Sequence, residues 1–136
     1  MARAKALAMA GAAGITPLSP MPRTPRRAIS AAEHAQALDR LDTLRAKLDR
    51  IVSDYDAMLS LSSTGEAPRG LDSTGDPIFN IGWTALHMPS ITLPVLYGAN
   101  GLPIGLQLAG ARYEEDRLIG AALELEAYFQ RRPITS

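Results

Sequence analysis

Serine and lysine side chains are the first candidates for chemistry in this sequence. A serine hydroxyl becomes an effective nucleophile only when a neighbouring base removes its proton. The adjacent Ser62 and Ser63 are a suggestive hydroxyl pair, but they lack glycine-rich surroundings that could present backbone amides to an oxyanion. The only lysines are Lys5, near the start of the chain, and Lys47, on the charged side of a predicted helix. We therefore expect no catalytic residue in this chain.

The two histidines and the glycine pairs give no stronger site. A serine, histidine and aspartate triad could be assembled around His34 or His87, but such unspaced sets occur in almost any chain, and both histidines are interpreted as structural. Two histidines without cysteine give no metal-ligand spacing. The glycines at 98 and 101 fit a hairpin and lack the lysine of a phosphate loop. We expect neither a metal nor a cofactor.

Length and charge limit the possible classes of protein. The chain has 136 residues, enough for one compact domain, and 14 basic against 14 acidic residues. Such a balance predicts no attraction to nucleic acid or to an anionic membrane. No apolar run approaches the roughly 20 residues of a membrane-spanning helix. The absence of cysteine fits a reducing compartment, and a cytoplasmic location is expected.

Residues 1–29 differ from the rest of the sequence. They are rich in Ala, Pro and Arg and contain no acidic residue, which predicts a disordered tail. An organelle targeting peptide is an alternative, although the prolines interrupt any long amphipathic helix, and a poorly chosen start site is another. Residues 30–136 are predicted to form the folded segment.

The folded segment is predicted to begin with a helix over residues 31–55. Ser30 and Glu33 have the spacing of a capping box. Apolar residues recur every three or four positions and predict one face packed on a core: Leu38, Leu41, Leu44, Leu48, Ile51 and Tyr55. The charged residues are interpreted as a solvated face, on which Arg45 and Asp49 form an ordinary i,i+4 pair.

The remaining elements alternate between strands and helices. A buried strand is expected over 56–62, a short helix over 78–86 after the capping pair Asp76-Pro77, and a final helix over 115–131. Strands over 90–97 and 104–109 flank Asn100-Gly101, a hairpin signal in which both residues need positive φ. The order predicts an α/β fold, a mixed sheet flanked by helices. Because three strands are few for such a sheet, we expect missing strands to belong to sequence outside this chain, and apolar strand surface to be exposed without them.

The most specific stretch runs from residue 73 to residue 94 and is followed by a second block over residues 101–110. It reads Ser-Thr-Gly-Asp-Pro-Ile-Phe-Asn-Ile-Gly-Trp-Thr, continues into Leu-His-Met-Pro-Ser-Ile-Thr-Leu-Pro, and is followed by Gly-Leu-Pro-Ile-Gly-Leu-Gln-Leu-Ala-Gly. This order and spacing resembles the C-terminal third of amidase-signature enzymes, a family that includes general amidases and the amidotransferase subunits of the same signature. The resemblance extends over about residues 31–129.

The resemblance implies an amide hydrolase with a serine nucleophile, a relay serine and a lysine base, all in an earlier part of the family's sequence. It also implies that Asp76, Asn80, Trp83 and Thr84 approach the substrate channel, although each also has a structural interpretation as cap, backbone ligand or core. Our preferred hypothesis is a C-terminal amidase segment, inactive unless an N-terminal segment complements it, with a small-molecule amide as substrate. The alternative is a non-catalytic binding or assembly module that retains part of the fold.

Overall fold

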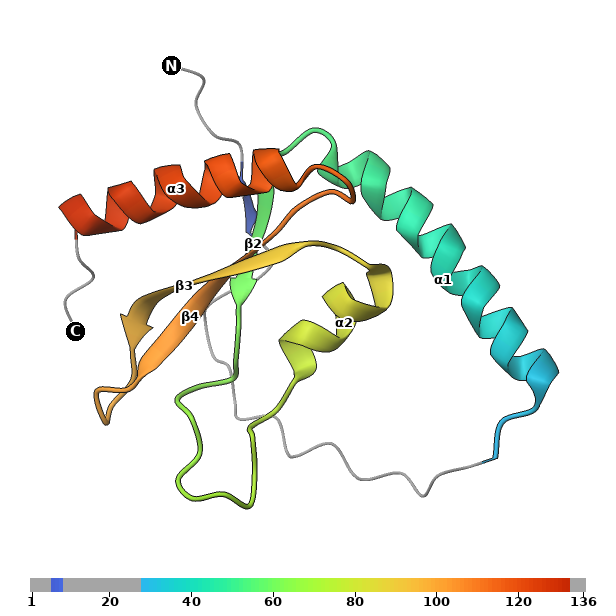
Figure 1. The fold of residues 1–136 in the computed structure, drawn as a ribbon, viewed down its shortest axis with the longest axis horizontal. Coiled ribbons are helices and arrows are strands. Elements are labelled where there is room, and N and C mark those ends of the chain that lie inside the picture. Colours follow the sequence, from blue (N-terminus) through green and yellow to red (C-terminus); the bar gives the residue numbers. More distant parts are fainter. Residues whose placement is uncertain (1–5, 9–27, 133–136) are drawn as a thin grey trace.

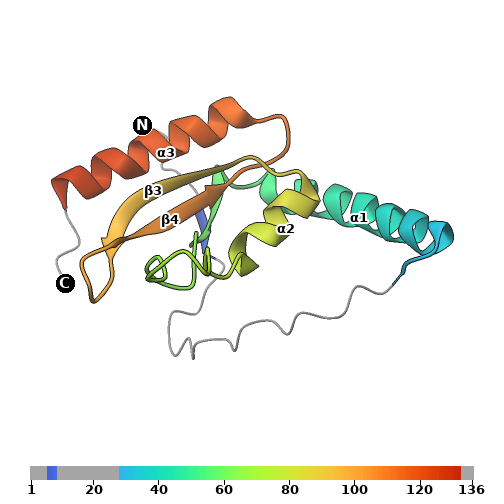
Figure 2. The same ribbon diagram turned by 60° about the horizontal axis from the view of Figure 1, so that its bottom comes forward.

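A four-stranded sheet with helices on both faces forms the protein (Figures 1 and 2). The structure is a computed structural model and describes residues 6–8 and 28–132. Its elements are β1 (Ala6–Ala8), α1 (Ala31–Val52), β2 (Ala57–Leu61), α2 (Ile78–Leu86), β3 (Ser90–Tyr97), β4 (Pro103–Ala109) and α3 (Glu115–Arg131). The strand order is β1-β2-β4-β3, with β1 parallel to β2 and the other two pairs antiparallel. The predicted α/β class with a mixed sheet is confirmed.

The order of elements after residue 29 follows the sequence prediction. α2, β3 and α3 have the predicted bounds, and α1 ends at Val52, three residues before the predicted end. The capping box at Ser30 is present, because the Glu33 amide donates to Ser30 Oγ at 3.2 Å and the Ser30 amide donates to Glu33 Oε2 at 2.9 Å. The predicted disordered tail lies outside the described residues, except for residues 28–29 and for β1, a strand that was not predicted.

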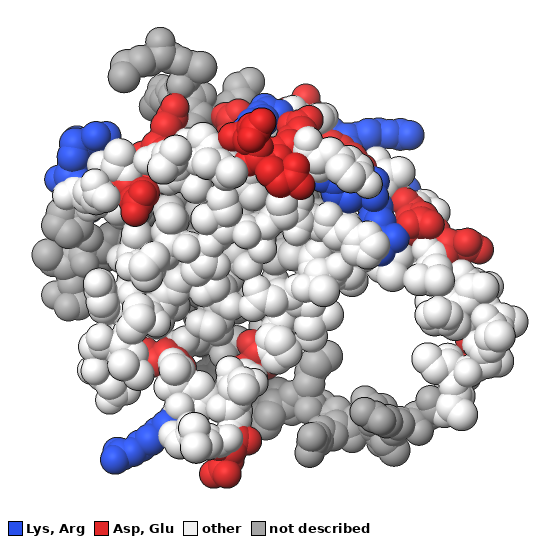
Figure 3. Space-filling view, viewed as in Figure 1, with Lys and Arg blue, Asp and Glu red and all other residues white. Residues whose placement is uncertain are grey.

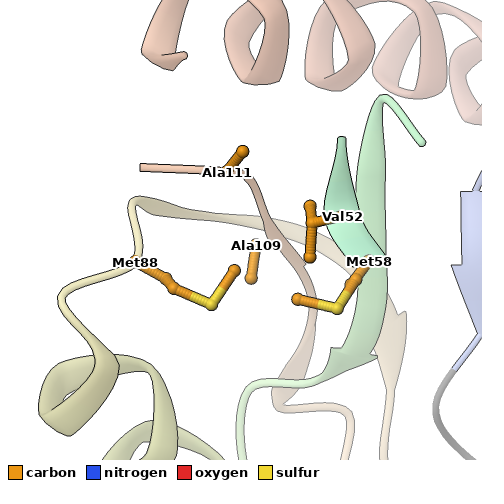
Figure 4. Close-up of a cluster of buried hydrophobic side chains, with 5 residues drawn as sticks. All are labelled: Val52, Met58, Met88, Ala109 and Ala111. Carbon is orange, nitrogen blue, oxygen red and sulfur yellow. The ribbon is translucent and has the colours of Figure 1, made fainter. Parts of the chain in front are cut away.

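Alternate residues of β2 and β4 point to opposite faces of the sheet, as expected for extended strands. On one face, Ala57 and Leu108 pack with Leu93, Leu118 and Ala122, and thereby join the sheet to α3. On the other, Met58 and Ala109 pack with Val52, Met88 and Ala111, the cluster drawn in Figure 4. α1 and α2 supply the partly buried Leu48, Trp83 and Leu86 to this second cluster. The core is therefore two thin layers, one on each side of β2 and β4.

The prediction that the apolar face of α1 packs on a core is largely wrong. Leu38, Leu44 and Ile51 are 45%, 51% and 52% exposed, and Val52 is the apolar residue of α1 that is fully buried. Figure 1 shows why: only the C-terminal end of α1 reaches the sheet, and the rest extends past α2. An apolar stripe identifies a face that needs a partner but does not place that partner in the same chain.

The predicted solvated pair of Arg45 and Asp49 is also wrong. Arg45 is only 9% exposed and pairs with Asp42, with Nη1 at 2.6 Å from Oδ1. Asp49 pairs instead with Arg112, whose Nη2 lies 2.5 Å from Asp49 Oδ2. The hydrogen bond from Arg112 is the main reason that the pKa of Asp49 is lowered, and the Arg112 charge adds to it. The predicted pair of Arg45 and Asp49 is therefore replaced by contacts with distant residues, since Arg45 binds the Ala85 carbonyl of α2 and Asp49 binds Arg112.

The β3–β4 hairpin is confirmed, but its turn differs from the predicted one. Of residues 98–101, only Gly101 has positive φ, at 77°, whereas Asn100 does not. The Gly98 amide donates to the Leu102 carbonyl and the Gly101 amide to the Gly98 carbonyl, both at 3.0 Å. Asn100 is held instead through its amide and side chain by the carboxylate of Glu66. A contact from a distant loop therefore decides the turn.

The predicted exposure of apolar strand surface is found in part. α3 covers one face of β3 and β4, and the α1 and α2 cluster covers the other face at Ala109 of β4, whereas Ser90 and Thr92 of β3 are exposed. Large apolar side chains are exposed at Tyr97 of β3, at Leu102 beside the hairpin turn, and on all three helices, for example at Leu44, Ile81 and Leu123. Figure 3 shows that charged side chains gather mainly at the upper edge, where α1 ends and α3 begins, and that most of the sheet and α2 region is uncharged. No described helix has the length and apolarity to cross a bilayer.

Candidate functional site

A buried amide side chain organises the α2 face of the sheet. Gln107, at the centre of β4, is 3% exposed. Its Oε1 accepts a hydrogen bond from Trp83 Nε1 at 3.1 Å and from Ser60 Oγ at 3.4 Å, while its Nε2 donates to Asn80 Oδ1 at 2.8 Å. A buried amide without such partners would cost free energy, so these bonds fix the orientation of Gln107.

Asn80 extends this network to the end of β2. Its Nδ2 donates to the backbone carbonyl of Ser62 at 2.9 Å, so one side chain joins α2 to both β2 and β4. The indole ring of Trp83 packs against the cluster of Val52 and Met58. Two of the four predicted channel residues, Asn80 and Trp83, therefore direct their polar atoms toward the sheet.

The other two predicted channel residues are placed differently. Asp76 lies one residue before Pro77, which is the N-cap of α2 in place of the predicted Asp76, and Asp76 Oδ1 accepts a hydrogen bond from the Ile78 amide at 3.0 Å. Thr84 lies in the last turn of α2 with an exposed side chain. The structure thus brings Asp76 and Asn80 to one end of α2 and leaves Thr84 near the other.

A hollow of about 320 Å³ lies at the Asp76 end of α2. Its lining comes from the loop after β2, from the turn before α2 and from the start of β4: Ser62, Ser63, Thr64, Gly65, Glu66, Ala67, Pro68, Thr74, Gly75, Asp76, Pro77, Asn80, Pro103 and Gly105. Gly105 leaves room for its neighbours, since a Cβ there would overlap the side chains of Thr92 and Ser62. The hollow is lined by both polar and apolar groups.

The described lining of this hollow holds serine and threonine hydroxyls and the carboxylates of Glu66 and Asp76. Ser63 Oγ donates to the Gly65 carbonyl at 2.7 Å, and the described lining includes no lysine or histidine. Lys47 is exposed on α1. A serine nucleophile needs a neighbouring group that takes its proton. The described lining therefore does not contain the pair of serine and lysine that the sequence resemblance implies for catalysis.

His87 has a structural position, as the sequence suggested. It ends α2 in the left-handed conformation, with φ of 56°. Its Nε2 lies 3.0 Å from Arg45 Nη2, which also donates to the Ala85 carbonyl at 2.7 Å. A guanidinium can only donate, so Nε2 of His87 is the acceptor in this contact. Arg45 and His87 together fasten α1 to the C-terminal end of α2.

Glu66 connects the rim of the hollow to the hairpin. Its carboxylate accepts hydrogen bonds from the Asn100 side chain at 2.5 Å and from the Asn100 and Leu102 amides at 2.8 and 3.0 Å. The hydrogen bond from the Asn100 side chain is the main reason that the pKa of Glu66 is lowered, and the backbone amides add to it. Sequence reasoning missed this residue and Gln107. A polar residue inside an apolar strand was the available signal for Gln107.

Comparisons with known proteins point to one group of enzymes. The chain is 32% identical over 102 residues to the A subunit of glutamyl-tRNA(Gln) amidotransferase from Agathobacter rectalis, a match of 70% of this chain and 20% of that protein. It is 32% identical over 88 residues to the corresponding protein from Pseudothermotoga lettingae, which covers 60% of this chain and 18% of that protein. The chain thus spans about a fifth of the length of the curated relatives that it matches.

The fold comparisons agree. The structure of 6-aminohexanoate cyclic dimer hydrolase matches 77% of this chain and 26% of its own, with a TM-score of 0.61 and 22% identity. An amidase crystal structure matches 74% of this chain and 26% of its own, with a TM-score of 0.60 and 23% identity. The glutamyl-tRNA(Gln) amidotransferase A subunit from Thermotoga maritima gives 0.53 over 64% of this chain and 20% of its own, with 26% identity. No family model matches the chain.

The mixed sheet with helices on both faces is thus the fold of part of an amidase. The chain belongs to the amidase-signature family, of which it corresponds to a C-terminal segment. The resemblance inferred from the sequence is confirmed.

Proposed function

We propose that residues 30–136 are the C-terminal part of an amide-hydrolysing enzyme and that the chain alone is inactive. In this proposal a separate or preceding N-terminal segment supplies the serine nucleophile, the relay serine and the lysine base. The observation that carries the proposal is the partial match: the chain has the fold of about a quarter of the amidase structures and none of the expected catalytic set.

The surface of the described residues supports such a partnership. The stripe of Leu38, Leu44 and Ile51 on α1 is about half exposed, and Figure 3 shows a largely uncharged face over the sheet and α2. Large exposed apolar areas usually mark an interaction site. We assign these surfaces to contact with the N-terminal segment.

We further propose that the hollow forms part of the wall of the substrate channel for a small-molecule amide. Asp76 and Asn80 line it, so they are the residues in this proposal that approach the substrate. Trp83 holds Asn80 in place indirectly, since both donate to or accept from Gln107. Thr84 is exposed at the other end of α2 and would face the N-terminal segment.

Complementation tests the proposal. The Thermotoga maritima amidotransferase protein, produced without the segment that this chain matches, would be mixed or co-expressed with this chain, and amide hydrolysis would be measured. We expect activity only with both parts. In the restored enzyme, Asp76→Asn should raise KM more than it lowers kcat, whereas Asp72→Asn, an exposed neighbour in the same loop, should leave both unchanged. Stable association without hydrolysis would favour the alternative, a binding or assembly module.

A further inference from the structure

β2 has the character of an interior strand although it lies next to the edge of the described sheet. Ala57, Met58 and Ser60 are 3%, 1% and 9% exposed, so both faces of the strand are covered. Its sequence is apolar except for Ser60, without the charges or prolines that usually protect an outer strand. Its neighbour β1 has only three residues and pairs with three of the five residues of β2.

The direction of the backbone groups of β2 follows from its pairing with β4. The Ser62 amide donates to the Gly105 carbonyl at 2.9 Å. Because backbone groups alternate along a strand, Met58 and Ser60 also face β4, and Ala57, Leu59 and Leu61 face the other way. β1 pairs with Ala57 and Leu59 but ends before Leu61. The outer edge of β2 therefore extends beyond the strand that covers it.

The opposite edge of the sheet is less suited to pairing. β3 forms that edge, and its register with β4 is irregular between Leu93 and Leu96, where Pro94 interrupts the strand. Proline lacks an amide donor, and an irregular edge discourages further pairing. A strand that extends this sheet is thus expected to join at β2, on the side where Figure 1 shows β1.

We propose that β1 is an exchangeable cover strand and that it occupies the place of a parallel strand from the N-terminal catalytic segment. The identity of the displacing strand rests on the proposed function. That strand would be longer than β1, would pair with Leu61 as well as with Ala57 and Leu59, and would carry no proline opposite them. In the absence of the segment, β1 shields the edge of β2 from pairing with other copies of the chain.

The register identifies a substitution that tests the cover strand. Leu7 lies opposite Met58. In a parallel pair, the backbone groups of Leu7 therefore point at those of Ala57 and Leu59, which face β1. Leu7→Pro removes the inward amide, whereas Ala8→Pro removes an amide that points away from β2 and is the matched control. Leu7→Ala keeps the backbone amide and shortens the side chain, so it distinguishes an effect of the amide from an effect of the side chain.

Hydrogen exchange of the Leu59 amide in the whole chain is the measurement, because in this parallel register the Leu59 amide faces the Leu7 carbonyl. We expect Leu7→Pro to loosen the pairing and reduce the protection of this amide about tenfold, with Leu7→Ala and Ala8→Pro close to the native chain. Equal protection in the native chain and Leu7→Pro would overturn the assignment of β1 as a cover.

Binding to the truncated Thermotoga maritima protein tests the exchange. Leu7→Pro should bind about tenfold more tightly than the native chain or Ala8→Pro, because the competing strand is lost. Equal affinity of all three, with hydrolysis restored, would contradict the exchange and leave the proposed function intact. If none of the three chains binds, the proposed function and the proposed displacing strand are both contradicted. The hydrogen-exchange result would still decide whether β1 covers the edge of β2.

Discussion

Trp83 Nε1 donates a hydrogen bond to Gln107 Oε1 at 3.1 Å and thereby joins α2 to the centre of the sheet. The same Gln107 side chain donates to Asn80, so one buried amide holds two residues of α2 one turn apart. A helix of nine residues has little stability alone. The position of α2, and with it one wall of the hollow, therefore depends on Gln107.

Replacement of Gln107 tests this dependence. Gln107→Leu leaves the Trp83 N–H without its acceptor and Asn80 Oδ1 without its donor, and we expect a loss of roughly 1–3 kcal/mol in the free energy of unfolding. Urea unfolding at low protein concentration, followed by the fluorescence of Trp83, the only tryptophan, measures it. Gln130→Leu on the exposed side of α3 is the control. Equal effects of the two substitutions would argue against the network.

Arg45 provides a second test, at the α1–α2 contact. Arg45→Met removes the bonds to the Ala85 carbonyl and to His87, and leaves the carbonyl without this donor. We expect a loss of roughly 1–3 kcal/mol in the same urea titration. Arg40→Met is the matched control, because Arg40 is exposed and donates a hydrogen bond to the Gln36 side chain of its own helix. A loss of less than about 0.5 kcal/mol for Arg45→Met would contradict the assigned role.

The contact between Glu66 and the hairpin should depend on pH. Because the folded-state pKa of Glu66 is lowered, the contact is stabilising above the unfolded-state value of about 4.3, and this stabilisation is lost as the pH falls through the lower folded value. The protection of the Asn100 and Leu102 amides, relative to their intrinsic exchange rates, should therefore decrease as the pH falls. Glu66→Gln should remove this pH dependence of the protection, whereas Glu124→Gln on α3 should not. An unchanged profile in Glu66→Gln would refute the contact.

The exposed stripe of α1 predicts self-association of the isolated chain. Leu38, Leu44 and Ile51 are about half exposed, so we expect concentration-dependent association and a broad thermal transition. Leu44→Gln should reduce the association measured by sedimentation, and Leu123→Gln, a similarly exposed leucine on α3, should reduce it less. A monomer with a sharp two-state transition would count against this expectation.

Local signals in the sequence were sufficient for most of the elements. The capping box at Ser30, the Asp76-Pro77 pair and the Asn100-Gly101 hairpin signal each act within a few residues, and the helices and strands they predicted are present. The errors arose where a distant residue competes with a local one. Arg45 binds α2 rather than Asp49, and Glu66 fixes a turn that Asn100 and Gly101 were expected to determine.

The candidate site was less predictable for the same reason. Asp76 and Asn80 lie close in sequence, and both line the hollow. Gln107 is 27 residues from Asn80, and its role appears only when β4 lies beside α2. β1 could not be anticipated, because three residues of Ala and Leu carry no strand periodicity. Pairing with β2 gives them their structure.

Amide hydrolysis by the purified chain alone, combined with labelling by a serine-reactive fluorophosphonate, is the most direct measurement. A panel of small aliphatic and aromatic amides should show no turnover, and no serine should be labelled, because in our proposal the N-terminal segment supplies the nucleophile and its base. Turnover with a labelled serine in this chain would contradict the proposal that catalysis needs an N-terminal segment. Ser62, Ser63 and Lys47 would then be the first residues to replace.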